Sequence, residues 1–191
     1  PWTFGPEYPW WKYWQRPVAT YKEMEELKHR IVSAEAMIFE ANIFSKTVKY
    51  GSSSAENIAI SAVSHDFDKL KSFELSEGRY FTEQESAGGR PIAIIGSAIA
   101  NSLFNGNEAS GRQIFTLGRN FTIIGVFEKE GSSIVGNSLD DMIVIPVNFA
   151  RNIMNLKSER LQPNIQVKGL PGITNNELME ELRSALRAIR R

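Results

Sequence analysis

The stretch RPIAIIGSAIANSLF, residues 90–104, is the most informative part of the sequence for the fold. It opens with a short aliphatic run, Ile92–Ile95, which has the character of a buried strand. Ser97 is a favourable N-cap residue, and the apolar positions after it recur at helical spacing. We therefore predict a strand followed directly by a helix that buries Ala98, Ile99, Leu103 and Phe104, as in a domain of mixed α and β structure.

The segment before this stretch is predicted to hold one helix and three strands. Thr20 and Glu23 have the spacing of a capping box, so a helix is expected to begin after Thr20. Beyond that helix the apolar residues follow the spacing of strands. The expected elements are strands over residues 34–44, 46–50 and 58–63, a hairpin turn at 51–54, and a short helical or irregular passage over 65–73.

The segment after residue 104 also alternates short strands with helices. Thr174 and Glu177 form another capping box, before a last amphipathic helix. Pro146 lacks a backbone N–H, so the strand before it is expected to end there. The expected elements are strands over residues 113–117, 121–127, 142–145 and 165–168, a hairpin turn at 118–120, and a short helix that includes Phe149, Ile153 and Leu156.

The composition excludes several classes of protein. The 191 residues include 22 basic and 22 acidic side chains, and this balance argues against a nucleic-acid partner. The absence of cysteine excludes a disulfide scaffold, a thiolate metal site and a cysteine nucleophile. The longest mostly apolar stretch, residues 91–100, is about half of the roughly 20 residues that a membrane span needs. Because the chain begins with Pro1 rather than Met, we expect that it was cut from a longer protein.

Three patterns with chemical potential have plainer explanations. Residues 131–138 have the spacing of a phosphate-binding loop, but Asn137 stands where the lysine should be, so a surface loop is expected. The sequence His65-Asp66-Phe67-Asp68 could bind a metal or act as a base. With only two histidines in the chain, it is interpreted as a solvated turn. Asp140 and Asp141 are likewise expected to cap a loop rather than bind a cation.

Four tryptophans lie within the first fourteen residues: Trp2, Trp10, Trp11 and Trp14. Their rings could pack back on the domain as a lid, lie at a membrane–water interface, or form a patch that binds a glycan or peptide. A basic cluster ends the last helix, and both helix capping and a position beside a membrane explain it. Its members are Arg183, Arg187, Arg190 and Arg191.

Four motifs follow one another in a characteristic order from about Thr20 to Arg191. They are EGRYFT at 77–82; RPIAIIGS at 90–97 with Ala100 and Leu103-Phe104; GRQI at 111–114 with FTIIGV at 121–126; and SLDD at 138–141 through Ile145-Pro146. The ordered set resembles the MacB-like periplasmic core domain, the large extracytoplasmic loop of MacB/FtsX-like ABC transporter permeases. The tryptophan-rich start has no general equivalent in that family.

The resemblance implies an α+β fold with two lobes, in which a mainly β sabre-like subdomain is inserted into a mixed α/β porter-like subdomain. It divides the chain into a membrane-proximal lead-in, residues 1–17, a porter-like subdomain, residues 18–82 and 163–191, and a sabre-like subdomain, residues 83–162. Gly78 and Arg79 are then expected at the boundary between the two subdomains, where glycine supplies backbone freedom.

The resemblance also implies a function without catalysis, cofactor or metal. The domain would lie in the periplasm at the inner membrane and couple cytoplasmic ATP hydrolysis to conformational change for export or lipoprotein handling. The implied partners are an ABC ATPase subunit or domain, a second permease copy, and a periplasmic adaptor or chaperone. The alternative from the residues themselves is an extracytoplasmic module that binds glycan or peptide through the tryptophan cluster. A further rival is an enzyme that uses His65.

Overall fold

The computed structural model describes residues 17–130 and 138–190, which form a mixed α and β domain. This confirms the predicted fold class. The helices are α1 (Tyr21–Lys28), α2 (Phe67–Leu70), α3 (Glu83–Ala87), α4 (Ser97–Phe104), α5 (Val147–Ile153) and α6 (Asn175–Ile189), with short 3-10 turns η2 (Leu139–Asp141) and η3 (Glu159–Leu161). The strands are β1 (Ala34–Tyr50), β2 (Ser53–Val63), β3 (Leu75–Gly78), β4 (Ile92–Ile95), β5 (Gln113–Thr116), β6 (Arg119–Phe127), β7 (Met142–Pro146) and β8 (Asn164–Gly169).

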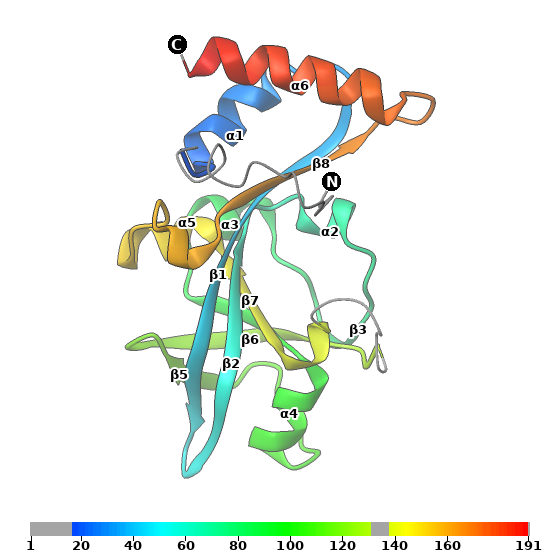
Figure 1. Ribbon diagram of the computed structural model, residues 1–191. Helices are drawn as coiled ribbons and strands as arrows, with labels where there is room; N and C mark the ends of the chain where they lie inside the picture. The colour runs from blue at the N-terminus through cyan, green and yellow to red at the C-terminus, as the bar shows by residue number, and fades with distance from the viewer. Residues whose placement is uncertain (1–16, 131–137, 191) are drawn as a thin grey trace, which may run out of the picture.

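All eight described strands belong to one sheet, whose order is β2-β7-β4-β6-β5-β1-β8, with β3 attached to β6. Because β1 also pairs with β2, the pairings return to their starting strand and close the sheet on itself. Closure of this kind leaves few free strand edges. The helices lie around this body: α1 and α6 form a layer at one end, and α4 covers the other end (Figure 1).

The long strand β1 connects the two ends of the molecule. Its 17 residues correspond to about 55 Å of extended chain. Its first part, residues 34–40, pairs with β8, and residues 40–50 pair with β2. The sequence predicted two strands here, and the structure joins them through a bulge at Ser45, whose φ is 54°. As Figure 1 shows, β1 and β2 run together from the α1–α6 layer to a hairpin tip at the far end.

Most of the predicted elements are confirmed, and the capping boxes at Thr20 and Thr174 both form. The prediction that Ser97 caps α4 is wrong: the N-cap is Gly96, and Ser97 is the first residue of the helix. The Ser97 hydroxyl instead donates to Asp140 Oδ1 over 2.9 Å. Asp140 therefore links α4 to the short turn η2. This structural role agrees with the expectation that Asp140 caps a loop.

The apolar interior lies inside the closed sheet and beneath α1 and α4. The larger cluster contains the β1 side chains Met37, Phe39 and Ala41 together with Ile99 and Leu103 of α4. A smaller cluster surrounds Phe67, Phe81 and Phe127. Strands from both predicted subdomains contribute to each cluster, and β3 pairs with β6 across the proposed boundary at residue 82. The division into residues 18–82 with 163–191 and residues 83–162 stays a prediction.

Candidate functional site

Residues 77–85, from the end of β3 to the first turn of α3, contain a connected network of polar contacts. It begins at Gly78, whose backbone approaches β6 more closely than any side chain would allow. A Cβ atom on Gly78 would lie 2.1 Å from the carbonyl oxygen of Ile124, and its φ of 72° is also unfavourable for other residues. On the facing strand, a Cβ on Gly125 would lie 2.8 Å from the carbonyl oxygen of Arg79. Two glycines thus allow the connection to lie against β6.

Glu77, the residue before this contact, fixes a second loop. Its Oε2 accepts hydrogen bonds from the backbone N–H groups of Ala109 and Ser110, over 2.9 and 3.0 Å. These residues belong to the connection between α4 and β5. A carboxylate that accepts two backbone N–H groups makes strong, charge-assisted hydrogen bonds. The strand β3 is therefore tied to the α4 end of the domain as well as to β6.

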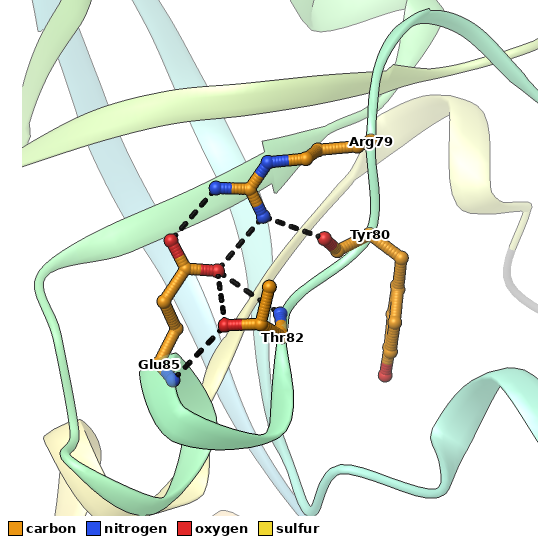
Figure 2. A network of polar contacts seen from close by, with 4 residues as sticks. All are labelled: Arg79, Tyr80, Thr82 and Glu85. Atoms are coloured by element: carbon orange, nitrogen blue, oxygen red, sulfur yellow. Dashed lines mark hydrogen bonds and ion pairs between the residues drawn. The ribbon is translucent and has the colours of Figure 1, made fainter.

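Arg79 and Glu85 then form a paired, two-point contact (Figure 2). Arg79 Nη1 donates to Glu85 Oε2 over 2.8 Å, and Nη2 donates to Glu85 Oε1 over 2.7 Å. The same Nη1 also donates to the carbonyl oxygen of Tyr80 over 2.9 Å. Bidentate pairs of this kind add geometric specificity to their electrostatic energy. The guanidinium therefore fixes the start of α3 relative to the end of β3.

Glu85 also completes a capping box with Thr82. The Thr82 N–H and hydroxyl donate to Glu85 Oε2, both over 3.0 Å, and the Glu85 N–H donates to Thr82 Oγ1 over 3.2 Å. The Glu85 side chain is 12% exposed. The hydrogen bonds from Arg79 lower the pKa of Glu85 most strongly. Burial raises it, but the hydrogen bonds from Thr82 lower it further, and the resulting pKa is about 2. The carboxylate is therefore charged at every physiological pH.

Aromatic rings pack beside this polar network. The Tyr80 hydroxyl donates to the carbonyl oxygen of His65 over 3.1 Å, and the Tyr80 ring lies 5.7 Å from that of Phe73. Phe73 in turn meets Phe127 of β6 edge-on at 5.1 Å. Burial, and next the nearby charge of Asp68, raises the pKa of the Tyr80 phenol, so the phenol stays neutral. Tyr80 thus packs against an aromatic cluster, whereas Arg79 and Thr82 beside it are exposed.

A second candidate site is the contact between α1 and α6, the first and last helices that the structure describes. Arg190 Nε donates to Glu23 Oε1 over 2.6 Å, and the two side chains are 33% and 13% exposed. Burial raises the pKa of Glu23, but the bonds from Arg190 and Thr20 outweigh it and leave a net lowering. In the middle of α6, Glu181 Oε1 accepts from the Val32 N–H over 2.9 Å. Two polar contacts therefore hold α6 against α1 and the loop after it.

The other predicted residues have structural partners or lie outside the described residues. Asp66 accepts from Lys28 and Lys69 over 2.6 and 2.7 Å, so the carboxylate next to His65 belongs to an ion-pair network. Among the described residues, no three or more His, Asp or Glu side chains are grouped in a way that could hold a metal. The phosphate-loop-like residues 131–137 lie outside the described part, as do all four tryptophans: Trp2, Trp10, Trp11 and Trp14.

The sequence pattern singled out Gly78 and Arg79, but it assigned no individual role to Thr82 and Glu85. A signal was present, because Thr82 and Glu85 have the same T-x-x-E spacing as the two capping boxes that were predicted. The role of Glu77 had no such signal, since its backbone partners follow more than thirty residues later. Within residues 17–130 and 138–190, no helix is both long and apolar enough to cross a membrane.

Comparison with known proteins identifies a family for nearly the whole chain. The family described as MacB-like periplasmic core domain matches residues 4–187. The macrolide export ATP-binding/permease protein MacB of Wolinella succinogenes is 29% identical over 123 residues, which are 64% of this chain and 19% of that protein. The pyoverdine export ATP-binding/permease protein PvdT of Pseudomonas aeruginosa is 33% identical over 85 residues, or 44% of this chain and 13% of that protein. The chain thus spans less than a fifth of the length of these relatives.

Solved structures agree in fold. The extracellular domain of the noncanonical ABC-type transporter YknZ from Gram-positive bacteria superposes with a TM-score of 0.73 at 16% identity, over 93% of this chain and 86% of that one. The periplasmic region of MacB from Actinobacillus actinomycetemcomitans also gives a TM-score of 0.73, at 12% identity, over 92% of this chain and 76% of that one. At these identities the likeness shows the fold alone.

Proposed function

The chain belongs to the family of MacB-like periplasmic core domains, and from that premise we propose that it transmits movement within an ABC transporter permease. In this proposal an ABC ATPase subunit or domain hydrolyses ATP on the cytoplasmic side, and the membrane helices pass the resulting movement to this domain. The domain itself performs no catalysis. It changes conformation in the periplasm in support of export or of substrate and lipoprotein handling.

The observation that carries the proposal is the contact between α1 and α6. Among the described residues α1 is the first helix and α6 the last, and the ion pair between Glu23 and Arg190 joins the first turn of α1 to the end of α6. Membrane segments attached to the two flanks would therefore act on one small area. We propose that residues 1–17, with their tryptophans, lie at the membrane surface beside it, because indole rings favour that interface.

The strand β1 supports the proposal as the route away from the membrane. It leaves the α1–α6 layer, pairs first with β8, and continues with β2 to the far hairpin (Figure 1). A paired strand of this length resists stretching, so a displacement at one end reaches the other. The far end, near α4 and the β1–β2 hairpin, is the surface that we assign to a periplasmic adaptor or chaperone, and a second permease copy completes the transporter.

We further propose that residues 77–85 form the junction between two lobes. On this view residues 18–82 and 163–191 form a porter-like lobe, and residues 83–162 a sabre-like lobe. The return of β8 and α6 to β1 and α1 supports the discontinuous first lobe. The bidentate contact between Arg79 and Glu85 would then hold the two lobes together at this junction.

Cross-linking can test the proposal, because these 191 residues contain no cysteine, and any cysteine in the rest of the transporter is first replaced by serine. In the complete transporter, the pair Glu23→Cys and Arg190→Cys is joined by a short bis-maleimide, which locks α1 to α6. The matched control joins Glu180→Cys to Arg183→Cys within α6, since these side chains also meet at 2.6 Å but lie on one helix. Hydrogen exchange of the domain is then compared between the ATP-bound and nucleotide-free transporter.

We expect nucleotide-dependent exchange at the tip of the β1–β2 hairpin in the control and in the unlinked variant. The link between α1 and α6 should abolish this difference while ATP hydrolysis continues. If no part of the domain changes its exchange with nucleotide, or if the locked form responds as the control does, the domain does not transmit movement through the α1–α6 contact.

A further inference from the structure

A groove of about 360 Å³ opens between the first turn of α1 and the residues that follow α5. Its size falls within the range of small-molecule sites. Its accessible apolar surface comes from Tyr21 and Met154, which are partly buried, and beneath them Phe39 and Leu156 are buried. The nine lining residues are Thr20, Tyr21, Lys22, Phe39, Arg151, Met154, Asn155, Leu156 and Lys157.

The rim of the groove is positively charged. Lys22, Arg151 and Lys157 contribute three cations, and none of the nine lining residues is a carboxylate. Among residues 17–130 and 138–190, no carboxylate lies within ion-pair distance of Arg151 or Lys157. Lys22 has only a loose contact with Glu26, at 3.7 Å on an exposed helix face. Such a contact contributes little energy, so all three cations remain available to an anion.

Arg151 is held in place before any ligand arrives. Its guanidinium lies over the ring of Tyr21, 4.6 Å from the centroid, and its Nη1 donates to Asn148 Oδ1 over 3.1 Å. The Tyr21 ring in turn meets Phe39 edge-on at 5.9 Å. Because the cation is already positioned on an aromatic wall, little conformational entropy is lost when an anion binds.

A second hollow adjoins the first at Arg151. It has a volume of about 290 Å³ and is mostly polar, with Asn148 and Asn152 beside Gly88 and Ala87. The two hollows together offer three cations, amide groups and the partly exposed apolar side chains Tyr21 and Met154. A free phosphate would use the cations and leave these apolar side chains in water. A neutral apolar molecule would cover them and leave the cations without a partner.

We propose that this composite groove binds an acidic phospholipid. The phosphate of the headgroup meets Arg151, Lys157 and Lys22, and its polar substituent reaches the hollow lined by Asn148 and Asn152. Part of an acyl chain covers the partly exposed side chains of Met154 and Tyr21. The choice of a lipid as the anion rests on the proposed function, which places the first turn of α1 beside the membrane. The recognition chemistry itself does not depend on movement or on transport.

The test is a titration of the 191-residue chain with dihexanoyl-phosphatidylglycerol below its micelle concentration, followed by calorimetry and by amide chemical shifts. The two comparison titrants are dihexanoyl-phosphatidylcholine and inorganic phosphate. We expect saturable binding of phosphatidylglycerol, with shifts at residues 20–22 and 151–157, and at least tenfold weaker binding of both comparison titrants. Since binding is measured on the chain alone, its outcome is independent of the cross-linking experiment.

Two variants test the charges one at a time. Lys157→Gln and Arg151→Gln are each expected to weaken phosphatidylglycerol binding about tenfold, the effect of one charge-assisted contact. If Arg151→Gln disturbs α1, Arg151→Lys replaces it, because lysine keeps the positive charge. The matched control is Lys49→Gln, which removes a charge from the exposed face of β1. Each of three results would overturn the proposal. The first is equal affinity for phosphatidylcholine, and the second is a response to phosphate as strong as that to the lipid. The third is unchanged binding both by Lys157→Gln and by the double variant that combines Arg151→Lys with Lys157→Gln.

Discussion

The close approach of β3 to β6 at Gly78 can be tested with a single methyl group. Gly78 and Gly118 have nearly the same backbone angle, φ 72° and 71°, but different surroundings. A Cβ on Gly78 would lie 2.1 Å from Ile124 O and 2.9 Å from the Gly125 Cα, whereas nothing lies within 4 Å of a Cβ on Gly118. The variants Gly78→Ala and Gly118→Ala therefore share the cost of an unfavourable backbone angle. Only Gly78→Ala adds a steric clash with β6.

The shared penalty is that of placing a residue with a Cβ in the left-handed region, about 1 kcal/mol. Gly118→Ala should lose only this amount, because Gly118 lies in the exposed two-residue turn between β5 and β6. Gly78→Ala must also separate two backbones that touch, and overpacking of this kind destabilises by about 1–3 kcal/mol. We therefore expect Gly78→Ala to lower the free energy of unfolding by about 2 kcal/mol more than Gly118→Ala.

The appropriate assay is urea denaturation followed by far-ultraviolet circular dichroism, since all four tryptophans lie within residues 1–14 and report on that segment. The two midpoints are compared at equal slope, so that the difference reflects stability rather than compactness. If the two alanine variants unfold at the same urea concentration, the close backbone contact between β3 and β6 does not exist in solution. The assignment of residues 77–85 as a tightly held connection would then be wrong.

Three further predictions concern the polar contacts. Because the pKa of Glu85 is lowered from about 4.5 to about 2, its carboxylate stabilises the fold above pH 4.5 and loses this contribution as the pH falls toward 2. Wild type should therefore lose more stability than Glu85→Gln between pH 5 and 2.5 in urea denaturation, and parallel losses would contradict this assignment. Thr82→Ala should lower the free energy of unfolding by about 1 kcal/mol, because the N-cap of α3 is lost, and Thr82→Ser should retain most of that energy. If the alanine and serine variants lose equal stability, the hydroxyl is not the cause. A double-mutant cycle of Glu23→Gln and Arg190→Gln should give a coupling of about 0.5–1 kcal/mol that weakens in 1 M salt, and a coupling of zero would mean that the ion pair does not fix α1 to α6.

Local chemistry was predictable from the sequence where a short pattern determines a short element. The capping boxes at Thr20 and Thr174 formed as predicted, because the partners lie three residues apart and need no distant contact. Thr82 and Glu85 follow the same rule and could have been recognised. Ser97 shows the limit of the rule: its hydroxyl pairs with Asp140, forty-three residues later, so the residue type alone could not identify its partner.

The arrangement of the strands depended on contacts that spacing does not encode. The bulge at Ser45 interrupts the alternation of β1, so one strand resembled two in the sequence. Closure of the sheet requires β1 to pair with both β2 and β5, and the first part of β1 also pairs with β8. The family resemblance implied an α+β fold but not the closed sheet. The groove beside α1 could not be predicted, since it forms only when residues near 20, 39 and 155 come together.

The pairing of β8 with β1 has a consequence for biogenesis. Glu40 lies opposite Asn164, so this part of the sheet cannot form until the chain has been synthesised beyond residue 164. As the polypeptide emerges on the far side of the membrane, the first half of β1 remains an open edge that can pair with another nascent chain. The last segment to arrive, β8 with α6, both closes that edge and covers α1. Maturation of the domain is therefore timed by its C-terminal end, and a chain that stops before residue 164 should be a substrate for periplasmic quality control rather than a shortened but working domain.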